Sequence, residues 1–289
     1  MPENPEPISF AELIIRQIFN PNINQARKIQ DGLDRFKIWI EGHRPGIEEC
    51  IKNIEKINRI DWAEASRRLD SMPELSKKSM TLLLPMGWFL GWVDSLSELL
   101  PLLESLDGID AKKVDDVMSK YYRENLDFIE KELTQRHQSR SDAIKAAFIA
   151  HRTLGDAGYF LSIPVFIAQA DGLLSEILKI SSPLSTSKKT KEIKCAIALR
   201  PAIINDQELS DLLLPFFALH DSDFLKSQAA RDKEVIQSGL AFTGLNRHQV
   251  LHGECSNYGS EINSLKALSF LTFVGLHLPM MLENKKISL

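Results

Sequence analysis

Cysteine is scarce in this sequence: only Cys50, Cys195 and Cys255 are present, and they lie far apart. An odd number of widely spaced cysteines supplies neither a disulfide framework nor a Cys-x-x-Cys metal knuckle. A reducing compartment fits this pattern best. The initial stretch Met-Pro-Glu-Asn-Pro-Glu-Pro also lacks the basic and then apolar order of a secretion signal. We therefore expect a cytoplasmic protein.

The sequence also lacks an excess of positive charge. Its 35 lysines and arginines are outnumbered by 39 aspartates and glutamates, which gives a formal net charge of -4. A protein that holds long nucleic acid by bulk electrostatics is usually basic, so this balance argues against such a function. Any contact with nucleic acid should be small and local.

Long hydrophobic runs are missing from the first part of the chain. The most apolar early stretch, residues 82–93, is shorter than the roughly 20 residues that a membrane helix needs, and it contains Pro85, Gly87 and Gly91. We therefore expect no membrane partner. Alternating apolar and polar residues that would mark a series of strands are missing as well.

The apolar residues instead recur at intervals of three and four, which is the spacing of one helix face. The clearest stripe consists of Ile47, Ile51, Ile54 and Ile57. The sequence therefore predicts an all-α protein. Its 289 residues exceed the usual single domain, and we expect an N-terminal helical domain at 1–120 and a C-terminal helical bundle at 121–289.

Prolines and glycines set the expected helix ends. Pro73 should interrupt the helix that precedes it, and Gly155–Gly158 should form a turn before a helix that opens at Ser162–Pro164. The segment Ser181–Lys194, rich in serine and lysine, should be a solvated loop. Pro279 should stop the apolar helix that covers the last part of the chain.

The candidate site is a short polar window between two hydrophobic segments. It contains Asn246, Arg247, His248, His252 and Glu254. An arginine offers a planar fork of donors to a phosphate, and a histidine readily moves a proton near neutral pH. This combination suits phosphodiester chemistry.

The spacing of Arg247 and His252 is a difficulty for a site formed by one helix. On an ideal helix, residues five apart lie roughly 140 degrees from each other. The two side chains would converge only if a helix begins between them, or if another element or another subunit shares the site. Arg247 near a helix N-terminus would suit an anion.

At these residues the sequence resembles a known family. Arg247-x4-His252 is similar to the R-x4-6-H signature of the HEPN superfamily (higher eukaryotes and prokaryotes nucleotide-binding). The surrounding Asn-Arg-His, the pair His252-Gly253, the following Tyr258 and the upstream segment Gln169–Gly172 agree with bacterial HEPN-type proteins. The resemblance covers roughly residues 121–283 and implies that the C-terminal region is a HEPN-like four-helix bundle.

The resemblance implies a metal-independent endoribonuclease without a cofactor. In this interpretation His252 handles the proton, Arg247 stabilises charge on the phosphate, and the 2'-hydroxyl of RNA attacks the adjacent phosphate, so that DNA is not a substrate. It also implies a homodimer whose two motifs line one cleft, and a bacterial defence or toxin role with an antitoxin or defence partner protein. The N-terminal domain would then be a sensor, dimerisation or partner-binding module.

Supporting roles are expected for several further residues. Asp171 lies beside an apolar helix face, and since a buried carboxylate needs a partner, we expect it to pair with Arg247; a backbone amide or another arginine is the alternative. Tyr258 and Asn263 should shape the pocket, or serve as an aromatic wedge and a helix cap.

Three alternatives to the nuclease stay open. Many active HEPN members carry a small polar residue where this chain has His248, which leaves room for a non-catalytic module that binds a nucleotide or a partner protein. His248 and His252 also have the spacing of a helical metal pair, with Glu254 nearby, although further ligands such as His220 or His277 would have to come from elsewhere. An all-α scaffold, with the motif as a structural hydrogen-bond network, is the third.

Overall fold

The computed structural model of the protein describes residues 62–91, 96–204 and 206–284. The chain divides into two compact units, Met1–Pro73 and Glu74–Leu289. The domain division expected at residue 120 falls inside a helix of the second unit and stays a prediction. The helices expected before residue 62, with the stripe at Ile47–Ile57 and Cys50, lie outside the described residues.

The described residues are almost all helical or in short connections, as the periodicity predicted. They contain no strand, and their sole β-type pairing is an isolated bridge between Thr186 and Ile193. The helices in chain order are α4 (Trp62–Leu83), η1 (Leu84–Met86), α5 (Leu96–Leu106), α6 (Ala111–Glu124), α7 (Leu126–Arg136), η2 (Gln138–Arg140), α8 (Ser141–Thr153), α9 (Gly155–Leu178), α10 (Lys194–Ile203), α11 (Gln207–Leu212), α12 (Leu214–Phe217), η3 (Leu219–Asp221), α13 (Gln228–Ser238), α14 (Arg247–Leu251), α15 (Glu261–Thr272), the π-helical turn η4 (Phe273–His277) and α16 (Leu278–Asn284). The all-α class is therefore confirmed for this part of the chain.

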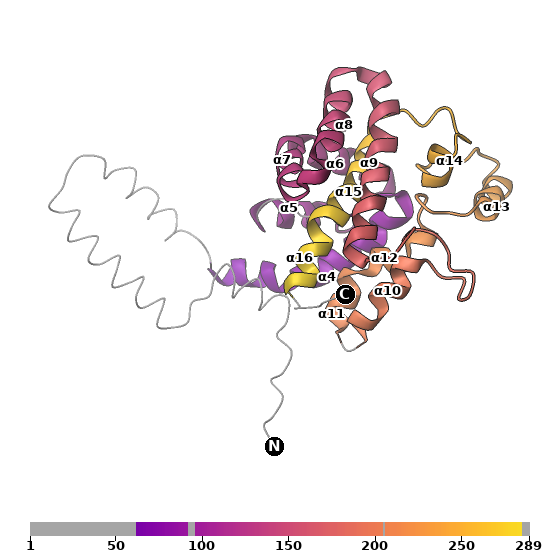
Figure 1. Ribbon diagram of the computed structural model, residues 1–289. Coiled ribbons are helices and arrows are strands. Elements are labelled where there is room, and N and C mark those ends of the chain that lie inside the picture. Colours follow the sequence, from indigo (N-terminus) through magenta and orange to yellow (C-terminus); the bar gives the residue numbers. More distant parts are fainter. Residues whose placement is uncertain (1–61, 92–95, 205, 285–289) are drawn as a thin grey trace, which may run out of the picture. The chain divides into compact units, whose positions relative to one another are not determined.

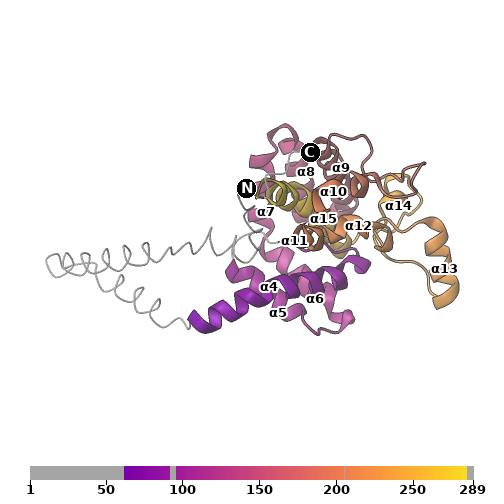
Figure 2. The same cartoon turned by 90° about the horizontal axis from the view of Figure 1, so that it is seen from below.

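Helix α15 lies among the other helices of the second unit, with α6 and α8 on one side and α9 on the other (Figure 1). It packs mainly against α9 and also contacts α6. Every residue from Ser264 to Thr272 is buried, including three serines and threonines. The first turn of α15 is partly exposed, with Ile262 37% exposed, and the rest of the helix is buried, which agrees with the low number of charged residues in this segment. Figure 2 shows the same arrangement seen from below.

Several predicted helix ends are wrong, and the reason is packing. Pro73 lies inside α4 and Pro164 lies inside α9. A proline removes one hydrogen bond from a helix, and burial of the surrounding apolar face offsets that loss. Pro279 does not stop the last helix either: the chain stays helical from Glu261 to Glu283, and Pro279 lies in α16, two residues after the π-helical turn η4.

The glycines at 155 and 158 belong to α9 and do not form a turn. A Cβ on Gly158 would lie 1.9 Å from the backbone oxygen of Ala150 in α8, so this glycine permits the close approach of α8 and α9. The segment expected to be a loop does connect α9 to α10 without a helix of its own, except that its last residue, Lys194, begins α10.

Two segments are long and apolar enough to cross a membrane by length and composition: α9, and the continuous stretch Glu261–Glu283. The apolar window of the second is 89% buried inside the protein, whereas that of α9 is 44% buried. Burial of 89% is typical of the core helix of a helical bundle. Length and apolarity alone therefore do not assign either helix to a membrane.

The core contains buried polar groups with specific partners. Trp88 is 1% exposed, and its indole N–H donates to Asp115 Oδ1 at 2.7 Å. In the middle of the bundle, Ser264 Oγ lies 2.8 Å from both His151 Nδ1 and Ser162 Oγ. These contacts connect α8, α9 and α15.

His277 is the most deeply buried histidine of the described residues. It ends the π-helical turn η4, and burial is the main reason why its pKa falls to about 3; the charge of Arg136 acts in the same direction. Its ring fills the space that a side chain at Gly91 would need, since a Cβ there would lie 2.6 Å from Nε2. This histidine is therefore neutral at physiological pH.

Candidate functional site

The motif forms α14, a helix of five residues beside α9. Arg247 is its first residue, and its guanidinium is ion-paired with the carboxylate of Asp171 in α9. The predicted partnership of these two residues is therefore confirmed. Both side chains are only 20% exposed. Asp171 Oδ1 and Arg247 Nε are buried and form no hydrogen bond within the described residues, so the pair keeps one unused acceptor and one unused donor.

Asn246 fixes the start of α14. Its Oδ1 accepts the N–H of Gln249 at 3.3 Å, which caps the helix, and also accepts from Arg231 at 3.1 Å. Its amide nitrogen donates to the carbonyls of Asp223 and Lys226 at 2.8 and 3.0 Å. At 2% exposure, with both side-chain polar atoms in use, Asn246 holds the motif in place and is not available to a substrate.

The two histidines of the motif form an exposed pair. The ring centroids of His248 and His252 lie 4.3 Å apart, one turn of α14 from each other. His248 Nε2 lies 3.1 Å from Glu254 Oε1, and the other carboxylate oxygen of Glu254 lies 3.5 Å from the guanidinium of Arg231. Arg231 thus holds Glu254, and Glu254 orients His248.

Arg247 and His252 have different neighbours. Arg247 faces α9 and Asp171, whereas His252 ends α14 and packs against His248 on the solvent side. Their divergence follows from five-residue spacing on a helix. Within one chain, therefore, the structure brings His248, His252 and Glu254 together and places Arg247 and Asp171 in a second, inner pair.

Tyr258 and Asn263 shape the loop that follows α14. The hydroxyl of Tyr258 donates to the carbonyl of Phe160 at 3.2 Å, and the two rings meet edge to face at 5.1 Å. Asn263 donates from its amide to the carbonyl of Tyr258 at 2.9 Å. Ser260, not Asn263, caps α15. Both predicted residues therefore have structural contacts, and both also line a pocket.

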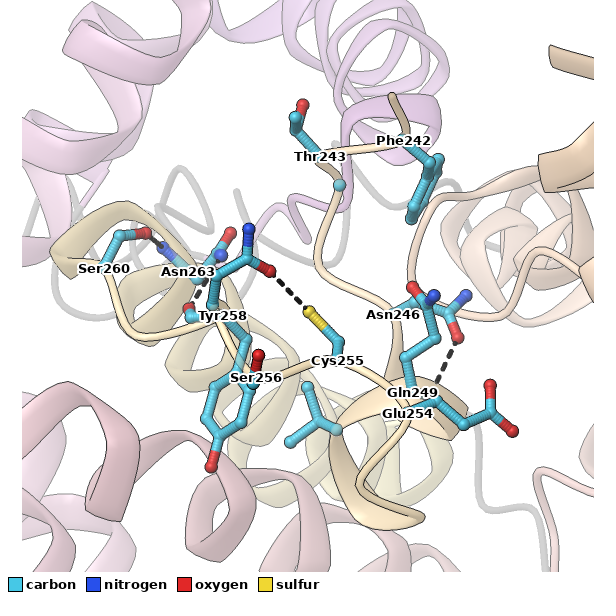
Figure 3. Close-up of a pocket in the computed structure, with 13 residues that line it drawn as sticks. Phe242, Thr243, Asn246, Gln249, Glu254, Cys255, Ser256, Tyr258, Ser260 and Asn263 are labelled. Atoms are coloured by element: carbon cyan, nitrogen blue, oxygen red, sulfur yellow. Dashed lines mark hydrogen bonds between the residues drawn. The ribbon is translucent and has the colours of Figure 1, made fainter. Parts of the chain in front are cut away.

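The pocket has a volume of about 570 Å³ and lies between the loops on either side of α14 (Figure 3). Its walls come from the loop before α14, from one side of α14 itself, and from the loop that leads into α15. The lining residues are Phe242, Thr243, Gly244, Asn246, Gln249, Val250, Glu254, Cys255, Ser256, Asn257, Tyr258, Ser260 and Asn263. Four predicted site residues are among them, but Arg247, His248, His252 and Asp171 are not.

Three residues around this site, Arg231, Phe242 and Lys226, were not predicted from the sequence. Arg231 is 5% exposed and contacts Asn246 and Glu254, and the ring of Phe242 lies 5.3 Å from Lys226 Nζ. Burial lowers the pKa of Lys226, but its bonds to Asp223 and Glu234 outweigh burial and raise it. Asn246 and Glu254 lie 15 or more residues from Arg231 along the chain, so local spacing does not indicate these contacts.

Among residues 62–91, 96–204 and 206–284, no group of three or more His, Cys, Asp or Glu is placed to hold a metal ion. His220 is paired with Asp221 at 3.4 Å and His277 is in the core, so neither joins the motif histidines.

No protein-family model matches the chain, and neither a curated protein nor a solved structure matches it. Any assignment of function therefore depends on the motif and on the geometry given above.

Proposed function

We propose that the protein is a metal-independent endoribonuclease of the HEPN type, acting in the cytoplasm in a bacterial toxin or antiphage-defence role. The observation that carries the proposal is the exposed pair of His248 and His252, with ring centroids 4.3 Å apart beside Glu254. Two adjacent imidazoles, one of them oriented by a carboxylate, are suited to taking and returning a proton. The biological role comes from the family resemblance alone.

In the proposed reaction His252 takes the proton of a ribose 2'-hydroxyl. The 2'-oxygen attacks the adjacent phosphorus, the bond from phosphorus to the 5'-oxygen breaks, and that oxygen receives a proton. The products are a cyclic phosphate and a free 5'-hydroxyl. Negative charge develops on the phosphate oxygens, and Arg247, whose side chain is 20% exposed, is the motif cation that we propose to stabilise that charge.

The geometry supports a shared site between two copies. A gap of 4.3 Å between ring centroids leaves no room for a phosphate between His248 and His252. The substrate phosphate would therefore lie beside the histidine pair. In an in-line displacement the 5'-oxygen leaves on the side of the phosphorus opposite the attacking 2'-oxygen, so a proton donor is needed on that opposite side. A second copy of the chain, presenting its own motif, is the source that we propose. This would also bring an Arg247 and a His252 from different chains to one phosphate.

One observation favours a second candidate, a nucleotide-binding module that does not cleave. The pocket beside α14 is lined by neither Arg247 nor His252, so a ligand could occupy it without touching either proposed catalytic residue. The pocket would then be the functional site, and the histidines would form its rim.

The test is incubation of the purified protein with a pool of tRNA and mRNA in EDTA, followed by mapping of the fragment ends. We expect the wild type to produce cyclic-phosphate ends, and His252→Ala to lose at least 100-fold in rate, the contribution typical of a general acid or base. His220→Ala is the matched control, because His220 is an exposed histidine outside the motif. Equal cleavage by His252→Ala and wild type would exclude the proposed role of His252.

A folded wild type that cleaves no RNA in the pool would favour the binding module. Thermal unfolding of each variant separates loss of chemistry from loss of fold. If Arg247→Ala and His252→Ala mainly lower the melting temperature, the motif is a structural hydrogen-bond network, and this result supports the all-α scaffold.

A further inference from the structure

We propose that the pocket beside α14 binds the base of a nucleotide. The identification of RNA as the source of that base rests on the proposed function, but binding itself is tested without cleavage. The volume of about 570 Å³ falls within the range of roughly 300–1,000 Å³ that small-molecule sites occupy. A nucleoside is a ligand of suitable size.

The charge of the lining selects the part of the nucleotide that enters. Among the described residues that line the pocket, Glu254 is the one charged residue, and none is a lysine or an arginine. A phosphate inside would meet a carboxylate and no cation, which makes it an unfavourable occupant. A neutral ligand rich in donors and acceptors, such as a nucleobase, suits these walls.

Amide side chains supply the hydrogen-bonding groups. Gln249 is half-buried, and its side-chain amide has no hydrogen bond with the rest of the described protein. Asn257 accepts from the thiol of Cys255 at 2.9 Å, and its amide nitrogen stays available. An amide presents a donor and an acceptor side by side, and this is how asparagine and glutamine read the edge of a base.

Phe242 supplies a surface for stacking. Its half-buried ring lines the pocket across from Cys255 and Ser256 in Figure 3. Lys226 Nζ and Arg231 Cζ lie 5.3 and 6.0 Å from the ring centroid, so the ring has cation contacts with Lys226 and with Arg231 of α13. Stacking of a base on an aromatic side chain contributes to binding whatever the base.

Glu254 connects the pocket to the histidine pair. It lines the pocket, and its Oε1 lies 3.1 Å from His248 Nε2. A base that fills the pocket therefore leaves its ribose and phosphate at the rim, on the side of His248 and His252. The pocket would read the base next to the cleaved phosphate.

Cys255 offers a direct report of occupancy. It lines the pocket and is partly accessible, whereas Cys195 is fully buried, and burial raises the pKa of its thiol to about 12. Cys195 should therefore react slowly with thiol reagents. In a Cys50→Ser variant of the full chain, the reaction with an aromatic disulfide reagent then measures Cys255.

The experiment compares the labelling rate of Cys255 with and without each of the four nucleosides and their 3'-monophosphates. Inorganic phosphate and ribose 5-phosphate are the comparison ligands. We expect at least one nucleoside and its 3'-monophosphate to slow labelling at least fivefold, and neither comparison ligand to do so. Titration calorimetry of the wild-type protein with the same nucleosides gives a second readout that does not depend on the thiol or on Cys50→Ser.

Matched variants localise the binding. Phe242→Ala should weaken nucleoside binding by roughly 5- to 150-fold, the loss expected for one stacked base, and Phe242→Trp should retain it. Ile236→Ala, an exposed apolar residue of α13 outside the pocket, should have no effect. If no nucleoside binds by either readout, or if inorganic phosphate alone protects Cys255, the base pocket is wrong.

The two proposals fail separately. A protein in which nucleosides protect Cys255 but RNA stays intact has the base pocket and is not the proposed ribonuclease. If RNA cleavage depends on His252 but no nucleoside binds and Phe242→Ala has no effect, the protein is the proposed ribonuclease and lacks the base pocket. His252→Ala should abolish cleavage and leave nucleoside protection of Cys255 unchanged.

Discussion

Arg247 in α14 is ion-paired with Asp171 in α9, across 76 residues of sequence. This contact attaches the short motif helix to one of the longest helices of the bundle. A helix of five residues has too few internal hydrogen bonds to persist alone, so its geometry depends on such contacts. The same pair keeps an unused buried acceptor, Asp171 Oδ1, and an unused buried donor, Arg247 Nε, within the described residues.

Removing one member of this pair should destabilise the protein. Asp171→Ala leaves a largely buried guanidinium without its partner, and we expect a loss of about 1–3 kcal/mol in the free energy of unfolding, discounted because each side chain is 20% exposed. Urea unfolding of Asp171→Ala, Arg247→Ala and the double variant gives the coupling energy. Glu192→Ala, which breaks the more exposed pair with Arg200, should cost below about 1 kcal/mol. Equal losses at both sites would contradict the burial argument.

Asn246→Ala should be among the most damaging changes in the motif. It removes the cap of α14, the acceptor of Arg231 and two donors to backbone carbonyls, and we expect a loss of about 2–4 kcal/mol. Ser260→Ala, which removes only a single cap bond of α15, should cost about 1 kcal/mol. Chemical denaturation of both variants makes the comparison, and similar losses would mean that the Asn246 contacts contribute little.

Gly158→Ala should separate α8 from α9. The new methyl group would lie 1.9 Å from the backbone oxygen of Ala150. Backbone atoms cannot rotate away from such a clash as a side chain can, so we expect a loss of about 3 kcal/mol or more in the free energy of unfolding. Gly155→Ala is the matched control: its surroundings are open, and the strain of a φ of +53° should cost about 1 kcal/mol. Calorimetric melting temperatures of the two variants should therefore differ clearly.

The free energy of unfolding should decrease as the pH is lowered through the range where histidine titrates. The folded-state pKa of His277 is about 3, mainly because of burial, and lies below the unfolded value of about 6.5. Between these values the unfolded chain binds a proton that the folded protein does not, so stability is complete above pH 6.5 and is lost as pH falls towards 3. Burial lowers the pKa of His151 in the same direction.

Urea unfolding at pH 7, 6 and 5 measures this effect. Each pH unit below 6.5 should cost up to about 1.4 kcal/mol for His277. The range stops at pH 5 because the hydrogen bond from Arg123 lowers the pKa of Glu261, and protonation of that carboxylate adds its own loss only at lower pH. His277→Gln should have a shallower pH dependence than the wild type, and an unchanged slope would assign the effect to other groups.

The sequence indicated the helical class because apolar spacing is a local property, and it indicated the Asp171–Arg247 pair because a carboxylate beside an apolar stripe needs a cation. It misplaced helix ends at Pro73, Gly158 and Pro279, since a proline or glycine has the same local preference whether or not a neighbouring helix overrides it. Arg231 gave no signal at all, because its burial depends on loops brought together by the fold.

The buried position of α15 has a consequence for protein synthesis. Helix α9 packs against α15, yet the ribosome finishes α9 at Leu178 and α15 only at Thr272. At about 5–20 residues per second, the apolar surface that α15 will cover stays open for roughly 5–20 s on each nascent chain. During this interval the half-made bundle is a surface to which chaperones, or other nascent chains, could attach, and codons that slow translation between the two helices would lengthen it.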